Sequence, residues 1–321
     1  MSTDGAAGGS SRQAVVAGLI CYVLWGAIPV LFIVIGRAGS SPWEILGQRA
    51  MWSAPWAALL VFAAGQGGQV AAAFRRPKTL MLLALSAAFI GSGWAVYVWS
   101  VNNGRNLEAS LGYYITPLLN MAAGAALFRE RIDRIGALAI ALAIVGVALQ
   151  TWALGHPPVI SLVLAGTFWA YGMIRRRIDT DAQAGLLVEC LLMAVPGLAF
   201  VLWLGHRGGA LFGHSLAGSI LLAATGPATV VPLALFAWTA RRLPFSTLGF
   251  LQFIGPTMGF AVGVFTGESL TPLRMVSFVF IWAGAATFVF GAWRAGRRLR
   301  NPLTGRPQAT ASLVNTGSDP A

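Results

Sequence analysis

The chain has 321 residues and a formal net charge of +12, yet only 10% of its residues are charged and 57% are hydrophobic. Its mean hydropathy is +0.72, whereas soluble domains carry about 25% charged residues, so we interpret it as an all-α polytopic integral membrane protein. The arginines lie in short clusters between apolar spans, where membrane topology explains them, and we expect no nucleic-acid partner.

Apolar spans alternate along the chain with short charged or Pro/Gly-rich breaks. Most approach or exceed the ~20 residues that a helix needs to cross about 30 Å of hydrocarbon. Only Gly155-His156-Pro157-Pro158 divides the fifth span from the sixth, and Pro-Pro is a natural turn. We predict ten transmembrane helices, at 13–35, 42–64, 79–102, 108–128, 135–152, 158–174, 182–204, 215–240, 245–266 and 273–293.

The two ends of the chain differ from these spans in composition. Residues 1–12 are small and polar, and we expect them to form a disordered N-terminal segment. Residues 296–321 begin with a basic cluster and continue with Pro, Thr, Ser and Gly, which is typical of a disordered tail.

The fourth and ninth spans share three features in the same order, which indicates an internal duplication. The offsets between them are 137 to 139 residues. We therefore expect a first five-helix half at 13–152 and a second at 153–295. Because five is odd, the second half is inverted relative to the first, a plan that secondary transporters use to build a solute site between the halves. The matching pairs are Ser110-Leu111-Gly112-Tyr113 with Thr247-Leu248-Gly249-Phe250, Pro117 with Pro256, and Glu130 with Glu268.

The distribution of lysine and arginine predicts the orientation. With a cytoplasmic N-terminus, the inner loops and the two ends hold 17 basic residues, against 4 in the outer loops and their margins. Cytoplasmic loops carry an excess of Lys and Arg, so we expect both termini in the cytoplasm.

Three residues of the second span share one helical face. Glu44, Gln48 and Arg49 follow each other at spacings that place them on the same side of a helix. Arg49 is roughly 12 Å inside the bilayer at ~1.5 Å per residue, and a charge at that depth is unlikely to face lipid. Arg49 either pairs with Glu44 or an anionic group of a solute, or it forms an ion pair that locks the second helix to a neighbour.

Glu189 is the only carboxylate deep in the seventh span. A carboxyl group at this depth can take a proton on one side of the membrane and release it on the other, as a proton-coupled carrier requires, and Glu44 is a second candidate for coupling. The alternative for Glu189 is a neutral, hydrogen-bonded packing residue.

Polar and aromatic side chains inside the spans are further candidates for solute binding. Asn120 and Gln252 flank the two prolines of the duplicated helices, and either line a polar cavity or hold the bundle together. Most aromatic residues lie near span ends, as in an interface belt, but Trp25, Trp94 and Tyr113 are candidates for stacking on a flat solute or a cation. The outer turn holds Asn102, Asn103 and Glu108, which suit either helix capping or an outer gate.

The sequence contains no P-loop, no metal-spaced His/Cys set and no nucleophile–His–Asp arrangement. Cys21 and Cys190 lie in apolar spans and suggest no disulfide. We therefore expect neither an enzyme nor a cofactor or metal, and any uphill transport must use an ion or solute gradient.

Several segments together resemble the RarD branch of the EamA family, in the drug/metabolite transporter superfamily. The resemblance covers about residues 12–295 and implies a ten-helix permease of the bacterial inner membrane, of a kind commonly described as exporting small metabolites or drugs. One departure is Gly93-Trp94, where the family pattern has Asn-Trp. The segments are Trp25-Gly26-Ala27-Ile28-Pro29, the run from Glu44 to Ser53, the run from Trp99 to Leu118, Tyr171-Gly172 before basic residues, Gly226-Pro227-Ala228-Thr229 before Pro232-Leu233, and Leu248-Gly249-Phe250-Leu251-Gln252-Phe253.

From these observations we expect a secondary active exporter in which two inverted halves rock around a central site. Its expected partners are a small-molecule solute, the lipid bilayer and protons, and a homodimer stays open. The alternatives are an uncoupled facilitator, an uptake permease and, from another class, a membrane-embedded enzyme or lipid-handling scaffold.

Overall fold

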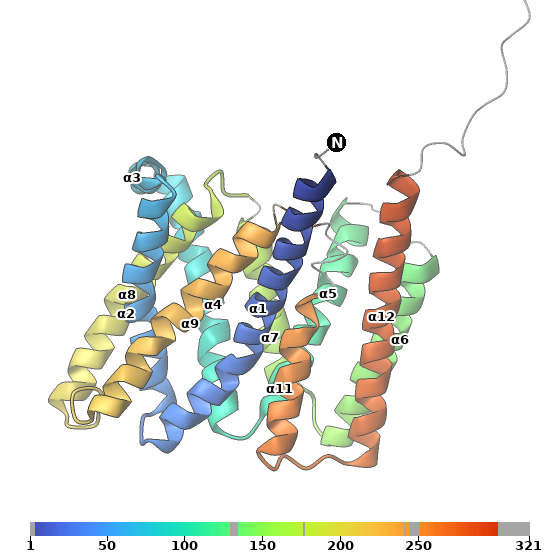
Figure 1. Cartoon of the computed structure of the whole chain (residues 1–321). Coiled ribbons are helices and arrows are strands. Elements are labelled where there is room, and N and C mark those ends of the chain that lie inside the picture. The colour runs from blue at the N-terminus through green and yellow to red at the C-terminus, as the bar shows by residue number, and fades with distance from the viewer. Residues whose placement is uncertain (1–3, 129–133, 176, 241, 244–250, 301–321) are drawn as a thin grey trace, which may run out of the picture.

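The computed structural model describes residues 4–128, 134–175, 177–240, 242–243 and 251–300, and within these ranges the regular elements are helices without a β-strand (Figure 1). The prediction of an all-α fold is therefore confirmed. The helices are α1 (Asp4–Arg37), α2 (Pro42–Ala63), α3 (Gly67–Arg75), α4 (Pro77–Asn102), α5 (Asn106–Phe128), α6 (Arg134–Leu154), α7 (Val159–Arg175), α8 (Ala182–His206), α9 (Leu216–Ala240), α11 (Ile254–Phe265) and α12 (Pro272–Arg300).

Each predicted span coincides with a helix, while α3 lies in a stretch where none was predicted. The ninth span coincides with α11, and its beginning at 245–250 lies outside the described residues. The helix α3 is short, starts with two glycines and makes an angle of 117° with α2. Its sequence lacks the length of a span, which is why the pattern of spans does not reveal it.

The terminal helices are longer than the sequence predicted. Helix α1 begins at Asp4, so residues 4–12, expected to be disordered, continue the first transmembrane helix. Helix α12 likewise runs on to Arg300, through the start of the expected tail, while residues 301–321 lie outside the described ranges. A long apolar helix already contains its nucleus, and each further residue adds a backbone hydrogen bond without a new nucleation cost.

Among the residues that the structure describes, six helical segments are long and apolar enough to cross a membrane on their own. The bent pair α2 and α3 brings this to as many as seven, and α7 and α11 are shorter apolar helices. The polytopic membrane architecture is thereby confirmed, and ten crossings are compatible with these helices. The six segments are Gln13–Arg37, Pro77–Asn102, Arg134–Ala153, Ala182–His206, Leu216–Phe236 and Pro272–Gly291.

Local sequence fixes where α2 begins and ends, and this places Arg49. The hydroxyl of Ser41 accepts a hydrogen bond from the Glu44 amide at 3.1 Å, and Pro42 occupies the first helical position, where its missing N–H costs nothing. Gly65 adopts φ +66° just after the helix, a conformation that glycine tolerates best. Helix α2 therefore presents Gln48 and Arg49 about two turns below its capped end.

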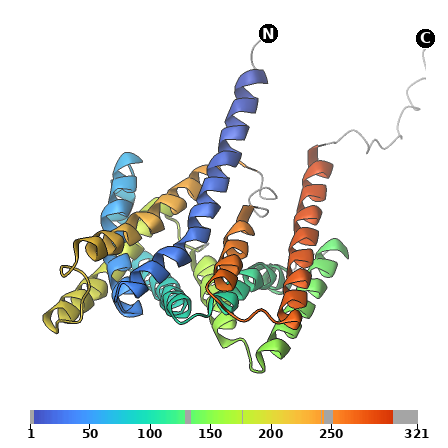
Figure 2. The same ribbon diagram turned by 60° about the horizontal axis from the view of Figure 1, so that its bottom comes forward.

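The helices pack in pairs that are distant in sequence. Helix α2 packs against α8 and α9, α1 against α9 and α11, α4 against α7 and α8, and α5 against α7 and α11. Helices α6 and α12 pack along each other at one side of the bundle (Figure 2). Small residues allow close approach, since a Cβ atom on Gly112 of α5 would lie 2.8 Å from the carbonyl oxygen of Ser161 on α7.

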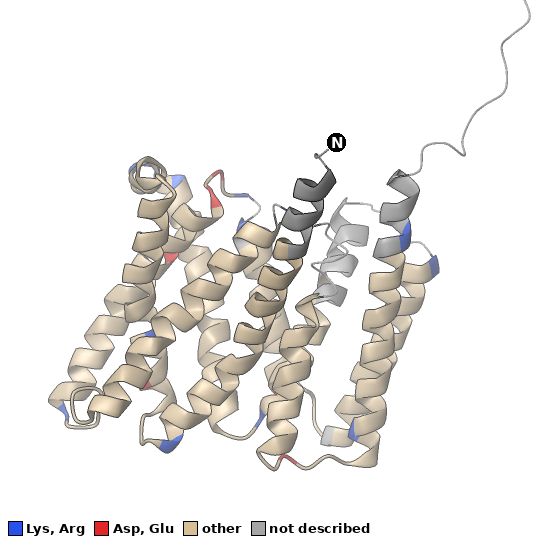
Figure 3. Ribbon diagram, in the orientation of Figure 1, with Lys and Arg blue, Asp and Glu red and all other residues tan. Residues whose placement is uncertain are grey.

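Apolar side chains of four helices form one cluster that lies next to the site described below. We call it the outer plug; its core lies within about two turns of the ends of α1 and α4 and of the start of α2. Most charged residues lie towards the two ends of the bundle, and the beginning of α1 and the end of α12 lie at the same end (Figures 1 and 3). The buried residues of the outer plug are Ile28, Phe32, Ile35, Ile45, Val98, Val101 and Leu222.

Candidate functional site

The Arg49 guanidinium is buried among aromatic rings and a hydroxyl group. It is 6% exposed, its Cζ lies 4.0 Å from the centroid of the Trp94 ring and 5.5 Å from that of Phe32, and its Nε donates to Thr229 Oγ1 at 2.8 Å. These contacts tie α2 to α1, α4 and α9. Aromatic faces and a hydroxyl partly replace the hydration that a buried cation loses.

Glu44 does not pair with Arg49, which was one of the two interpretations of Arg49. One carboxylate oxygen of Glu44 accepts the hydroxyl hydrogen of Ser40 at 2.8 Å, and the other accepts the backbone N–H groups of Leu211 and Phe212 at 2.8 and 3.0 Å. Glu44 is fully buried and binds the loop between α8 and α9 to the start of α2. Within the described structure, Arg49 therefore has no carboxylate within 4 Å.

Gln48 lies beside Arg49 and has an unused donor. Its Oε1 accepts the indole N–H of Trp52 at 3.0 Å, and its buried Nε2 finds no hydrogen-bond partner among the described residues. Buried polar groups are usually hydrogen-bonded, so an unpaired amide next to a guanidinium suits an acceptor such as a carbonyl or carboxylate oxygen of a solute.

Tyr113 joins this cluster through a series of ring contacts. Tyr97 stands edge-on to Tyr113 with the centroids 5.5 Å apart, and Phe32 stands edge-on to Tyr97 at 6.3 Å. Neither tyrosine hydroxyl makes a hydrogen bond to a described residue. Arg49, Gln48, Trp94 and Tyr113, all predicted from the sequence, thus belong to one neighbourhood, which we call the central cluster together with Tyr97 and Thr229.

The remaining predicted solute-binding residues lie apart from these contacts. Trp25 packs on Tyr22 and Phe236, with ring centroids 5.5 and 5.9 Å away, next to the outer plug. Gln252 precedes α11, is exposed and makes no hydrogen bond to a described residue. Asn120 falls on α5, but its side chain lies outside the described residues.

Glu189 occupies a second buried polar cluster, which we call the Glu189 cluster. Its carboxylate accepts the Ser86 hydroxyl hydrogen at 2.5 Å and the Tyr171 hydroxyl hydrogen at 3.4 Å, and lies 3.6 Å from Nη1 of Arg175. Glu189 is 1% exposed. The contacts connect α8 with α4 and α7, and Gly185 leaves the space that the Arg175 guanidinium fills.

The sequence pointed to the two buried charges but not to their partners. Arg175 looked like one more inner-loop arginine, and Ser86, Thr229 and Tyr97 carry no motif of their own. At the departure from the family pattern, a Cβ atom on Gly93 would lie 2.8 Å from the Thr167 hydroxyl oxygen, so this glycine allows α4 and α7 to approach closely. A contact between helices so distant in sequence leaves no local signal.

Comparisons with known proteins agree with this architecture. Residues 12–152 match the EamA-like transporter family. An uncharacterized transporter of Pseudomonas aeruginosa is 42% identical over 91% of this chain and 98% of its own length, and protein RarD of Streptomyces exfoliatus is 36% identical over 97% and 98%. A solved crystal structure at 17% identity has the same fold, with a TM-score of 0.60 over 88% of this chain and 99% of its own.

The relatives cover nearly the whole chain, and the fold has the helices of a polytopic membrane protein. The chain therefore belongs to the EamA-like transporter family, and is a RarD-type membrane transporter of the drug/metabolite transporter superfamily.

Proposed function

We propose that the protein is a secondary active transporter that exports small metabolites or drugs across the bacterial inner membrane by alternating access. The central cluster holds the solute, and Glu189 exchanges the coupling proton. A buried guanidinium, an unpaired Gln48 amide and aromatic faces suit a solute with a carbonyl or carboxylate oxygen and a flat apolar body.

The packing of the helices supports two inverted halves, 13–152 and 153–295. If α1, α2, α4, α5 and α6 correspond in order to α7, α8, α9, α11 and α12, then the contact of α1 with α9 has its counterpart in α7 with α4. The contact of α1 with α11 likewise corresponds to α7 with α5, and α2 with α9 to α8 with α4. A chain of unrelated halves has no reason to repeat its contacts in this way.

One observation carries the proposal: Arg49 and Glu189 each form a hydrogen bond from one half to the other. Arg49 on α2 binds Thr229 on α9, and Glu189 on α8 binds Ser86 on α4, so the two bonds join corresponding pairs of helices. Rocking of one half against the other must change such bonds. A solute at Arg49 or a proton on Glu189 then favours one arrangement over the other, which is what coupling requires.

The ion pair of Glu189 with Arg175 favours a second candidate, an uncoupled facilitator. A carboxylate with its own cation and two hydroxyl donors already has its charge and hydrogen bonds compensated by the protein. Its role is then to hold helices together rather than to exchange protons. Transport in the uptake direction is compatible with the same geometry.

A flux assay with the full-length protein in proteoliposomes tests the proposal, using a panel of amino acids, nucleosides and amphenicols. We expect at least one solute to move against its gradient when a proton gradient is imposed, and Glu189→Gln to abolish this dependence while passive exchange continues. Glu108→Gln is the matched control, because Glu108 is also a buried carboxylate with an arginine neighbour, Arg105 at 3.5 Å, but lies at the outer turn. Gradient-independent flux of the wild type would establish the facilitator instead.

A further inference from the structure

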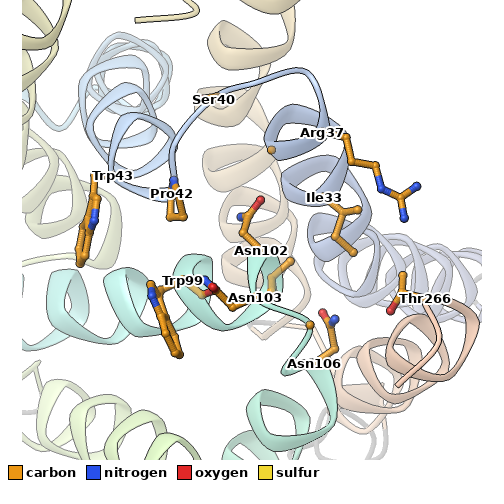
Figure 4. Close-up of a pocket in the computed structure, with 13 residues that line it drawn as sticks. Ile33, Arg37, Ser40, Pro42, Trp43, Trp99, Asn102, Asn103, Asn106 and Thr266 are labelled. Atoms are coloured by element: carbon orange, nitrogen blue, oxygen red, sulfur yellow. The ribbon is translucent and has the colours of Figure 1, made fainter. Parts of the chain in front are cut away.

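The structure contains a chamber at the ends of α1, α4 and α11 and the starts of α2 and α5, apart from the central cluster. Its volume is about 570 Å³. Figure 4 shows Asn102 in the middle of the lining, with Trp43 and Trp99 on one side and Asn106 and Thr266 on the other. We call it the outer chamber.

Three asparagines line the outer chamber, and the protein engages one of the two N–H donors of each side-chain amide. The Nδ2 atom of Asn102 donates to the Val98 carbonyl at 2.9 Å, that of Asn103 to the Trp99 carbonyl at 2.8 Å, and that of Asn106 to Glu268 Oε1 at 2.8 Å. These bonds also settle which side-chain atom is nitrogen. None of the three amide oxygens accepts a hydrogen bond from a described residue, so these oxygens are open to a ligand, and an oxygen accepts hydrogen bonds.

Asn106 supplies the strongest indication that a ligand binds here. Its side chain is 2% exposed, and its buried Oδ1 has no hydrogen-bond partner among the described residues. A buried acceptor without a donor costs free energy, which a ligand N–H or O–H group removes.

The hydroxyl groups of the lining also donate their hydrogen bonds to the protein. Ser40 donates to Glu44, and Thr266 donates to the carbonyls of Val262 and Gly263 at 2.9 and 3.0 Å. Behind the lining stand two carboxylates, Glu44 bound to Ser40 and Glu268 bound to Asn106. Acceptor oxygens in front of negative charges favour a donor that is itself positively charged.

One cation and two indoles complete the lining. The guanidinium of Arg37 extends away from the asparagine amides in Figure 4, and Arg37 is exposed. Trp43 is 52% exposed, and Trp43 and Trp99 lie on the same side of Asn102. Their rings offer an apolar surface and, through their faces, attraction for a cation.

The outer plug separates this chamber from the central cluster. Val101 belongs to both the chamber lining and the plug, and Phe32 of the plug contacts Arg49. If the transport proposal holds, an exported solute passes through this chamber once the outer plug has opened.

We propose that the outer chamber is a binding subsite for amines: solutes that present a primary ammonium group to the three asparagine oxygens and rest an aromatic or apolar body on Trp43 and Trp99. The role of this subsite in the transport path rests on the proposed function. The binding of an amine does not, because binding needs no transport.

Calorimetric titration of the full-length protein in nanodiscs tests the proposal with three probes that share a phenylethyl body. Phenethylamine carries three N–H donors, its N,N,N-trimethyl derivative keeps the charge without them, and 3-phenylpropionate reverses the charge. We expect phenethylamine to bind about tenfold more tightly than the trimethyl derivative, as lost charged hydrogen bonds imply, and 3-phenylpropionate to bind most weakly at this subsite. Equal affinity for the two cations, after subtraction of empty nanodiscs, would overturn the proposal.

Variants locate the binding to the chamber. Asn103→Leu removes one acceptor at an exposed position whose own bond is only to its helix, and we expect it to weaken phenethylamine about fivefold without affecting the trimethyl derivative. Trp43→Ala should weaken both cations, whereas Trp203→Ala, a tryptophan of similar exposure (50%) outside the chamber, should weaken neither. Unchanged phenethylamine affinity in both chamber variants would overturn the proposal.

The two proposals fail separately. Amine selectivity in the absence of gradient-driven flux would leave the subsite standing and remove the coupled transport function. Active flux of other solutes without amine binding at the chamber would do the reverse.

Discussion

At the scale of single residues, Arg49 and Glu189 differ in the kind of partner that holds each buried charge. Arg49 has two rings and a hydroxyl, whereas Glu189 has a cation and two hydroxyls. The difference matters for function, because a cation without a counter-ion within 4 Å attracts an anionic group more strongly than a paired one does. This is why we place the solute at Arg49 and the proton at Glu189.

The planar guanidinium of Arg49 is essential to this arrangement, and Arg49→Lys tests it. Lysine keeps the charge but loses the stacking on Trp94 and the fixed bond to Thr229, interactions worth about 1–2 kcal/mol. We expect about a tenfold drop in the affinity for a transported solute, measured as the concentration giving half-maximal flux. Arg274→Lys, at a half-buried position away from the central cluster, should leave that concentration unchanged, and an unchanged value for Arg49→Lys would remove Arg49 from the solute site.

Glu44 is better understood as a structural residue, and its removal should destabilise the protein. Glu44→Ala leaves the Ser40 hydroxyl and two backbone N–H groups without their acceptor. We expect the free energy of unfolding, measured by titration with denaturing detergent, to fall by about 2–3 kcal/mol. Asp179→Ala, which removes an exposed carboxylate, should change it by less than about 0.5 kcal/mol. A loss no larger than that of the control would show that the loop between α8 and α9 is held by other contacts.

The depth and polarity of residues within the spans revealed the candidate residues, but the sequence did not reveal which residues contact one another. Arg49, Gln48, Trp94 and Tyr113 stand out as polar or amphipathic groups inside apolar spans. That Arg49 rests on Trp94 depends on how α2 and α4 cross, and no periodicity within either helix encodes that crossing. Arg175 shows the opposite case: it belongs to a basic cluster between two spans, and this concealed its contact with a buried carboxylate.

At the scale of elements, hydropathy was sufficient to predict the membrane spans but did not predict the structure between them. Uninterrupted apolar runs of about 20 residues have few stable alternatives to a helix, because every backbone polar group in lipid needs an internal partner. Helix α3 escapes this logic, since it is too short to span and begins at Gly67 and Gly68. The lengths of α1 and α12 were underestimated for a related reason. Hydropathy marks where an apolar run ends, but a helix can continue beyond the hydrocarbon region.

Glycines at helix crossings make a second prediction at this scale. A Cβ atom on Gly226 of α9 would overlap the backbone carbonyl of Trp52 on α2, whereas one on Gly166 of α7 meets nothing within 4 Å. Gly226→Ala should therefore separate α2 from α9 and lower the free energy of unfolding by about 1–3 kcal/mol. Gly166→Ala should raise it slightly, by up to about 1 kcal/mol, because alanine favours helices. Equal effects of the two substitutions would show that α2 and α9 do not approach as closely as described.

At the scale of the whole molecule, the repeated contacts and the charge bias support the same arrangement. In the proposed inverted repeat, equivalent helices cross the membrane in opposite directions, and the two polar bonds, Arg49–Thr229 and Ser86–Glu189, belong to corresponding helix pairs. Their charges are opposite, which a strictly symmetric duplication would not produce. The proposed function accordingly assigns a solute-binding position to one copy and a coupling position to the other.

The orientation can be tested by labelling single cysteines with a membrane-impermeant maleimide. The native Cys21 and Cys190 are buried, so they contribute little background in intact cells. Because 17 basic residues fall on one side and 4 on the other, we expect Lys78→Cys to react only after the membrane is permeabilised, and His206→Cys and Ser269→Cys to react in intact cells. All three positions are exposed, so differences in reactivity report the side of the membrane rather than burial. Labelling of Lys78→Cys alone in intact cells would invert the molecule, and would place the outer chamber at the cytoplasmic face.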